Sequence, residues 1–217
     1  MVMEERRRMV VGLRGRGLSL SEEVESVLLK VPRHLFLPED VRSCAYRDAP
    51  LPIGDGQTVS APHMVAIMAE ALELREGHKV LEIGAGSGYN AAIMAELVGP
   101  GGRVITMERH GSLAKRAARV LLERGYSNVQ VVVGDGSLGY PEEAPYDRIS
   151  VTCGAPGVPG PLAEQLGEGG VMVIPVGGLE HQSLLRVRKV GGRTATEDLG
   201  SVIFVPLIGE RGHRSKQ

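Results

Sequence analysis

The spacing of hydrophobic residues changes along the chain, and it predicts alternating strands and helices. Apolar residues recur every three to four positions over 62–74, the period of a helix, whereas 80–83 is a short, largely apolar run, typical of a buried strand. From residue 79 onward the two patterns alternate. The predicted strands cover 80–83, 103–107, 129–133, 147–152 and 171–176, and the predicted helices cover 89–98, 112–124 and 161–166. This alternation predicts right-handed crossovers and a parallel sheet.

The first third of the chain has a different pattern. Ser19 and Glu22 have the spacing of a capping box, and apolar residues at helical spacing follow them until Pro32, where we expect the helix to end. Prolines and glycines then predict a long loop up to residue 59. Loops of this length are uncommon unless they bind something.

Near the end of the chain, segments 183–190 and 202–207 are rich in strand-forming residues and are separated by Gly191 and Gly192. No helix fits between them, so we expect an antiparallel pair at the edge of the sheet. The predicted fold class is thus α/β, a Rossmann-like, doubly wound and mostly parallel sheet with an antiparallel C-terminal strand pair. A length of 217 residues favours one domain. We divide it into N-terminal helices and an active-site loop (1–75), a cofactor-binding core (76–178), and C-terminal strands with a tail (179–217).

Composition narrows the classes of function. A net charge of −1 and an aromatic content of 3% do not suit a protein that binds nucleic acid by bulk charge or by stacking bases. We interpret the cluster Arg6, Arg7 and Arg8 as a solvated helix face. The cysteines and histidines lack the spacing of a metal site, so none is expected. The absence of a long apolar run or a secretory signal predicts no membrane span and a soluble cytoplasmic protein.

A glycine-rich turn lies where the first predicted strand meets the next helix. Gly84, Gly86 and Gly88 give G-x-G-x-G, and the position of the third glycine in the dinucleotide fingerprint is Tyr89. Tight turns alone can explain glycines, but this strand–turn–helix context favours a bound cofactor. The departure at Tyr89 disfavours a nicotinamide or flavin dinucleotide. The pattern resembles the cofactor turn of Rossmann-like methyltransferases, which predicts S-adenosylmethionine as cofactor and S-adenosylhomocysteine as product.

Two acidic residues follow the next two strands. Glu108 ends the second strand, where a carboxylate can accept hydrogen bonds from both ribose hydroxyls. Asp135 follows the third strand and could accept one from the adenine amino group, although Asp-Gly is also a common turn dipeptide. Together with the glycine turn, they place three candidate cofactor contacts at three successive strand ends.

Several segments together resemble protein-L-isoaspartate O-methyltransferases. Residues 46–64 read YRDAPLPIGDGQTVSAPHM, and the further segments are VPRH (31–34), VLEIG (80–84), GDG (134–136), APYD (144–147), VIPVG (173–177) and VIFVPL (202–207). The resemblance runs from about residue 20 to about residue 207. The GQTVSAPHM segment is specific to that family, whereas many methyltransferases share the glycine turn.

The resemblance implies an activity and a set of site residues. The activity is methyl transfer to the carboxylate of L-isoaspartyl, and by extension D-aspartyl, residues in damaged proteins. Separately, we expect the protein to be a monomer. Ser60 is the implied catalytic residue, and Ser60, Ala61 and Val205 are the implied substrate contacts. The implied cofactor contacts are Gln57, Thr58, Val59, Ser60, His63, Glu82, Gly84, Ala85, Gly86, Ser87, Asn90, Glu108, Arg109, Asp135 and Gly136.

Three points stay open at this level. Ser60 stands just before a predicted helix, where serine is also a preferred N-cap, so spacing alone does not separate cap from catalyst. The family leads us to expect an alanine-rich turn after the fourth strand, but the chain has Thr152-Cys153-Gly154, with Cys153 as a small buried filler. A nucleic-acid or small-molecule methyltransferase, or a non-catalytic module, could use the same fold. Residues 150–156 lack the D/N-P-P-aromatic motif that amino-directed nucleic-acid methyltransferases carry after the fourth strand. The intact glycine turn and Ser60 disfavour a non-catalytic module.

Overall fold

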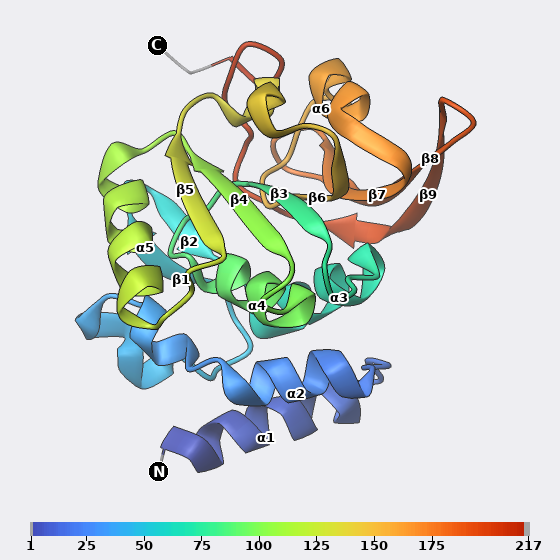
Figure 1. The fold of residues 1–217 in the computed structure, drawn as a ribbon. Helices are drawn as coiled ribbons and strands as arrows, with labels where there is room; N and C mark the ends of the chain where they lie inside the picture. Colours follow the sequence, from blue (N-terminus) through green and yellow to red (C-terminus); the bar gives the residue numbers. More distant parts are fainter. Residues whose placement is uncertain (1, 215–217) are drawn as a thin grey trace.

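The computed structural model describes residues 2–214, in which helices flank one large sheet (Figure 1). The helices are α1 (Val2–Gly15), α2 (Glu22–Lys30), α3 (Pro62–Leu72), α4 (Tyr89–Val98), α5 (Gly111–Glu123) and α6 (Gly160–Gln165). Short 3-10 helices are η1 (Arg33–Phe36), η2 (Glu39–Cys44), η3 (Gly136–Leu138) and η4 (Pro141–Glu143). The strands are β1 (Leu51–Gly54), β2 (Gln57–Val59), β3 (Lys79–Ile83), β4 (Arg103–Glu108), β5 (Val129–Val133), β6 (Tyr146–Val151), β7 (Leu166–Gly177), β8 (Gln182–Val190) and β9 (Arg193–Val202).

The sheet has seven strands in the order β5-β4-β3-β6-β7-β8-β9. Strands β3 to β7 are parallel to one another, and β8 is antiparallel to both β7 and β9. The predicted fold class is confirmed, a mostly parallel doubly wound sheet with antiparallel strands at its C-terminal edge. Chain order reverses at β3, since β4 lies on one side of it and β6 on the other. The carboxyl ends of β3 and β6 therefore form a topological switch point, where such sheets bind ligands.

Alternation along each strand builds a core on each face of the sheet. Val80 belongs to the cluster that packs helices α1 to α5 against the sheet, while its neighbour Leu81 belongs to the cluster beneath α6. Successive side chains of a strand point to opposite faces, which explains the division. Glu82 shares the Val80 face and is fully buried there.

The predicted long loop contains regular structure. Helices η1 and η2 occupy its first half, and β1 and β2 pair as an antiparallel hairpin just before α3. Elements this short carry little hydrophobic periodicity, so the sequence pattern did not reveal them. The second strand of the hairpin carries Gln57 and Thr58.

The cap of α2 was assigned to the wrong serine. The N-cap is Ser21, whose hydroxyl accepts a hydrogen bond from the Val24 N–H at 3.3 Å, rather than Ser19. The Ser21 N–H and hydroxyl also donate to Glu70 on α3, at 2.6 and 2.9 Å. A contact between helices distant in sequence thus decides where α2 begins.

The last strand was also misplaced. Strand β9 directly follows Gly191 and Gly192 and spans Arg193–Val202, whereas residues 203–207 leave the sheet and approach Gly154. Because β9 is an exposed edge strand with polar residues on both faces, it lacks the apolar pattern of a strand. The apolar run after it lines a cavity instead.

Arg6 is buried, which corrects its interpretation as part of a solvated face. Only 6% of its surface is exposed, and its guanidinium donates to the carbonyls of Leu29 and Lys30 at 2.7 and 3.0 Å. It thereby satisfies free carbonyls in the last turn of α2. Arg7 and Arg8 are exposed. Among residues 2–214, no helix combines the length and apolar character required to cross a bilayer.

Candidate active site

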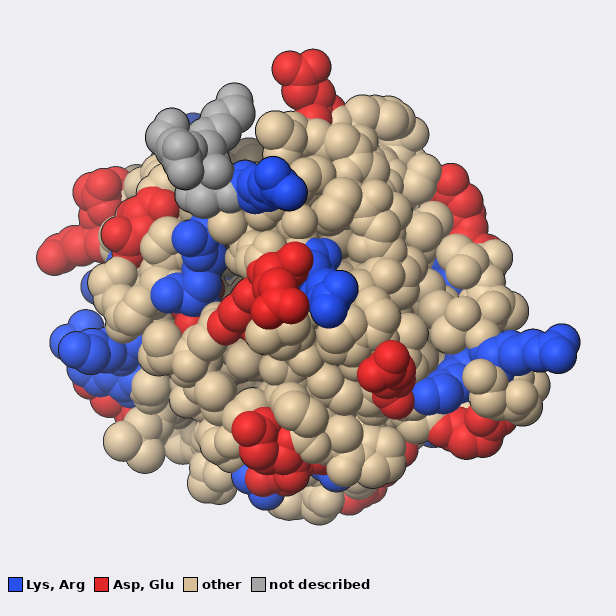
Figure 2. All heavy atoms as spheres, turned by 90° about the horizontal axis from the view of Figure 1, so that it is seen from above, with Lys and Arg blue, Asp and Glu red and all other residues tan. Residues whose placement is uncertain are grey.

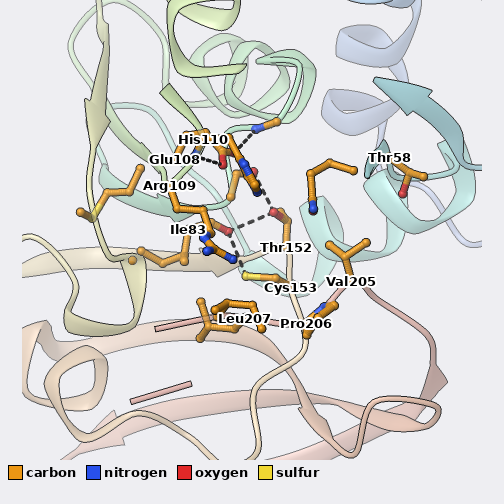
Figure 3. Close-up of a pocket in the computed structure, with 16 residues that line it drawn as sticks. Thr58, Ile83, Glu108, Arg109, His110, Thr152, Cys153, Val205, Pro206 and Leu207 are labelled. Carbon is orange, nitrogen blue, oxygen red and sulfur yellow. Dashed lines mark hydrogen bonds between the residues drawn. The ribbon is translucent and has the colours of Figure 1, made fainter. Parts of the chain in front are cut away.

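Three adjoining cavities lie at the carboxyl edge of the sheet. The first is the sheet-edge cavity, a space of about 660 Å³ that includes its open mouth (Figure 3). Its lining consists of Gln57, Thr58, Ile83, Gly84, Gly86, Met107, Glu108, Arg109, His110, Gly136, Thr152, Cys153, Val205, Pro206, Leu207 and Ile208. Figure 2 shows the molecule from above Figure 1, with acidic and basic side chains interspersed over this view and no field of one sign.

The two other cavities continue from the first. The turn cavity lies beside the glycine turn and is lined by Thr58, Val59, Ser60, Val65, Gly84, Ala85, Gly86, Ser87, Asn90 and Thr152. The outer groove is wider and is lined by Pro50, Thr58, Ser60, Ala61, His63, Met64, Thr152, His181, Ser201, Val202, Ile203, Phe204 and Val205. Within residues 2–214, Thr58 and Thr152 line all three.

Most of the residues expected at the site lie on these cavities. Ser60 lies between the turn cavity and the outer groove. Ala61 and His63 line the outer groove alone, so His63 lies on the side of the predicted substrate contacts rather than with the cofactor contacts. Glu82 and Asp135 line none of the three.

The backbone of the glycine turn is fixed by its neighbours. The N–H groups of Gly84 and Ala85 both donate to the Met107 carbonyl at the end of β4, at 2.9 and 3.0 Å. Gly84 has a φ of +99°, which favours glycine, and a side chain there would meet Thr152. The turn therefore approaches the cavity with bare backbone.

Glu108 connects the turn with the next strand end. One carboxylate oxygen accepts from the Gly86 N–H at 2.9 Å and the other from the His110 N–H at 3.0 Å. The side chain is 6% exposed and faces the sheet-edge cavity, where Figure 3 shows it beside His110. Each oxygen retains a lone pair, so this carboxylate can accept two ligand hydroxyls.

A buried arginine connects the serine segment to α4. The Arg33 guanidinium is fully buried, donates to the Ala45 carbonyl at 2.9 Å and the Ser60 carbonyl at 2.7 Å, and lies 4.9 Å from the Tyr89 ring centre. Burial lowers the pKa of Arg33 and raises the pKa of Tyr89 to about 12. Tyr89, at the position of the third fingerprint glycine, thus supplies an aromatic face for a cation.

Ser60 is not the cap of α3. The N-cap is Ala61, without a side-chain bond, and the His63 N–H instead donates to Asp48 at 2.9 Å. The same Asp48 oxygen lies 2.9 Å from His63 Nδ1, and Arg16 pairs with the second oxygen. Within residues 2–214 the Ser60 hydroxyl has no hydrogen-bond partner, so of its two expected roles the cap is wrong.

Asp135 and Glu82 are held by the protein itself. Asp135 accepts from the Ser137 N–H and hydroxyl and from the Glu210 N–H, at 2.9, 2.7 and 2.8 Å. Burial opposes ionisation of Asp135, but these bonds outweigh it and lower the pKa of the carboxyl. Glu82 accepts from Asn90 at 2.8 Å and from Thr106 at 2.5 Å, beneath the turn.

Some residues at the cavity were not expected from the sequence. His110, Thr152 and Cys153 line the sheet-edge cavity, and the last two follow β6 directly. The rule that ligands bind at carboxyl strand ends applies to β6 as well as to β3 and could have found them. Cys153 is buried, and burial raises the pKa of its thiol, which agrees with its predicted role as a filler. No group of three or more potential metal-ligating side chains occurs in residues 2–214.

Comparison with known proteins decides the family. The family model described as Protein-L-isoaspartate(D-aspartate) O-methyltransferase matches residues 4–212. The chain belongs to this family. A protein-L-isoaspartate O-methyltransferase of Methanopyrus kandleri is 57% identical over 214 residues, covering 98% of this chain and 95% of that protein. One of Methanosarcina mazei is 56% identical over 210 residues, covering 96% and 85%.

Solved structures agree with this membership in the methyltransferase family. One described as a protein-L-isoaspartate O-methyltransferase has a TM-score of 0.88 and 33% identity, covering 95% of this chain and 67% of that chain. A beta-aspartate methyltransferase from Plasmodium falciparum, in complex with S-adenosyl-L-homocysteine, has a TM-score of 0.85 and 27% identity, covering 94% and 98%. The predicted family and cofactor are confirmed.

The residues present fit S-adenosylmethionine. The sheet-edge cavity combines a hydroxyl-binding carboxylate, Glu108, with the apolar side chains of Ile83, Met107 and Leu207, as a nucleoside requires. The turn cavity adds the bare backbone of Gly84 and the polar side chain of Asn90. A polar amino-acid end can therefore occupy the second cavity while the nucleoside occupies the first.

Proposed function

We propose that this methyltransferase carries out its family's reaction where the three cavities meet. The reaction transfers a methyl group from S-adenosylmethionine to the free carboxylate of an L-isoaspartyl residue, and D-aspartyl residues are a further predicted substrate. The observation that carries the proposal is that Ser60 lies between the turn cavity and the outer groove with an unoccupied hydroxyl. A carboxylate that enters from the groove reaches this hydroxyl before it reaches the glycine turn.

The two sides of the site receive different residues. Glu108 and Gly136 on the sheet-edge cavity, with Gly84, Gly86 and Asn90 around the turn, support the cofactor side. We assign Ala61, His63 and Val205, on the outer groove, to the substrate side. The remaining predicted cofactor contacts on the cavities are Gln57, Thr58, Val59, Ala85, Ser87 and Arg109. Glu82 and Asp135 act from behind the cavity wall. Glu82 holds the side chains of Asn90 and Thr106, and Asp135 holds the backbone N–H groups of Ser137 and Glu210.

The reaction requires little from the protein except the alignment of the substrate carboxylate with the methyl group. A substrate carboxyl with a pKa near 4 is ionised at neutral pH, so no general base is required. When bound, the cofactor supplies an electrophilic methyl carbon on a sulfonium sulfur, to which the C–S electron pair returns. The Ser60 hydroxyl donates a hydrogen bond to one carboxylate oxygen and leaves the other free to attack. Alignment of reacting groups can lower the barrier by roughly 7–11 kcal/mol.

Three broader assignments accompany this function. Residues 1–217 act as one domain, which is supported by a core cluster that includes Leu13, Val80 and Phe204, one from each predicted segment. A monomeric state and the absence of nucleic-acid partners stay predictions. The interspersed charges on the face drawn in Figure 2 agree with the second of these. A cytoplasmic location also stays a prediction.

A paired peptide assay tests the function. The purified protein is given labelled S-adenosylmethionine with an isoaspartyl peptide or with its normal aspartyl twin. We expect methylation of the isoaspartyl peptide alone, because the normal carboxylate hangs from a differently spaced backbone and cannot reach the methyl group from the same pose. Equal labelling of both peptides would leave only a generic carboxyl methyltransferase.

A further inference from the structure

Thr152 occupies a central position that the family's reaction does not yet explain. Thr152 directly follows β6, the strand that lies beside β3 in the sheet. Its N–H donates to the carbonyl of Ile83, the last residue of β3, at 2.9 Å. Figure 3 shows its side chain between the strand ends and the segment that carries Val205. Its side chain lines the sheet-edge cavity, the turn cavity and the outer groove. Thr152 therefore lies where the cofactor side of the site meets the substrate side.

The Thr152 hydroxyl contacts the glycine turn. Oγ1 lies 2.8 Å from the Gly84 carbonyl oxygen and 3.0 Å from the Ile83 carbonyl oxygen, and its single proton is shared between these acceptors. The Ile83 carbonyl already accepts from the Thr152 N–H. The Gly84 carbonyl has no other hydrogen-bond donor within residues 2–214.

The contact also explains why residue 84 is a glycine. A Cβ atom at Gly84 would come within 2.4 Å of Thr152 Oγ1, much closer than such atoms approach, and the φ of +99° already favours glycine there. Gly84 and Thr152 therefore fit as a pair. An alanine at position 152 would supply no hydroxyl to this carbonyl.

Thr58, the other residue common to the three cavities, serves as a contrast. It lies on strand β2, is exposed, and its side chain makes no hydrogen bond within the described residues. The cavity junction therefore has one threonine that is free and one that is tied to the cofactor turn.

We propose that Thr152 is a positioning residue for methyl transfer, whose hydroxyl fixes the Gly84 carbonyl, and with it the glycine turn, at the junction of the three cavities. The proposal rests on the proposed function for its effect on turnover, but its effect on cofactor affinity is independent of any peptide. Removal of the hydroxyl leaves a polar carbonyl unpaired at the cavity wall, so the turn loses its preferred orientation.

Three matched variants test the proposal. Thr152→Val keeps the size and branching of the side chain without a hydroxyl, and Thr152→Ser keeps the hydroxyl without the methyl group. As a control, Thr196→Val makes the same exchange at an exposed position of β9 that lines none of the three cavities. Titration calorimetry with S-adenosylhomocysteine gives affinity without turnover, and thermal unfolding reports the fold. The isoaspartyl peptide assay gives kcat and KM for each protein.

We expect Thr152→Val to bind S-adenosylhomocysteine about tenfold more weakly, the effect of losing one hydrogen bond and leaving its acceptor, the Gly84 carbonyl, without a donor. Its kcat should fall as well, with KM for the peptide little changed, while Thr152→Ser and Thr196→Val stay within about threefold of the wild type in affinity. Wild-type affinity and turnover in Thr152→Val would overturn the proposal. Equal losses in Thr152→Val and Thr152→Ser would also overturn it, because the hydroxyl would then not be responsible. A wild-type protein that binds the cofactor product but ignores the peptide would contradict the function and leave the affinity test intact.

Discussion

The sequence allows Ser60 two roles, N-cap of α3 or catalytic residue, and the structure excludes the first. Its position before α3 fits an N-cap, yet Asp48 supplies the side-chain hydrogen bond to the first turn and Ser60 supplies none. We expect Ser60→Ala to leave the melting temperature nearly unchanged and to lower turnover on the order of tenfold to a hundredfold, the value of a charge-assisted hydrogen bond. Melting temperature and turnover are measured on the same preparation.

Ser21 supplies the matched control for that experiment. Its hydroxyl is the cap of α2, far from the cavities, so Ser21→Ala should cost about 1 kcal/mol of stability and leave turnover intact. If Ser60→Ala behaves like Ser21→Ala, with a lower melting temperature and normal turnover, then Ser60 has no catalytic role.

Glu108 is the residue on which nucleoside binding depends in our assignment. Glu108→Gln replaces one carboxylate oxygen by an NH₂ group, which cannot accept from the Gly86 or His110 N–H. We expect affinity for S-adenosylmethionine to fall roughly tenfold or more, since hydrogen bonds to charged groups are worth about 1.5–3 kcal/mol. Turnover at saturating cofactor should change much less. Calorimetry on this variant, with the exposed Glu123→Gln as control, measures the difference, and an unchanged affinity would mean that Glu108 does not bind the cofactor.

At the scale of elements, the sequence predicted those with strong periodicity. The helix predicted at 89–98 is α4 with the same bounds. The parallel strands were found because most of them bury a short, largely apolar run, and β5, which is only partly buried, has a run of valines. The elements it missed are those whose identity depends on their surroundings. Strand β9 is polar because it lies at an edge, and η1 and η2 are too short to show a period.

The same distinction applies to the site. The glycine turn and Glu108 were predicted because their strand–turn context is local in sequence. Asp135 was expected at the adenine, but the C-terminal segment at Glu210, 75 residues away, engages its carboxylate. The cap provided by Asp48 and the support from Arg33 also bridge segments far apart in the chain. Spacing along a sequence carries no information about such contacts.

At the scale of the whole molecule, the buried acid beneath the glycine turn couples the stability of the fold to pH. Glu82 joins three elements, since Asn90 on α4 and Thr106 on β4 both donate to its carboxylate. Burial raises the pKa of Glu82 from its ordinary 4.5 to about 7, against those two bonds and with help from Glu108. The charged form is therefore the less favourable one in the folded protein.

The sign of the pH effect follows from linkage. Because the folded protein holds this proton more tightly than the unfolded chain, Glu82 contributes its full stability below about pH 4.5, and the contribution is lost as the pH rises through about 7. Glu82→Gln is neutral at every pH and can still bond to both partners. We expect its melting temperature relative to wild type to rise by several degrees between pH 5 and pH 8, since a pKa unit is worth about 1.4 kcal/mol. Thermal unfolding across this range, with the exposed Glu164→Gln as control, separates Glu82 from the other titrating groups, which both proteins share. Parallel profiles for wild type and Glu82→Gln would mean that Glu82 is already ionised in the folded protein and that its two hydrogen bonds compensate for burial.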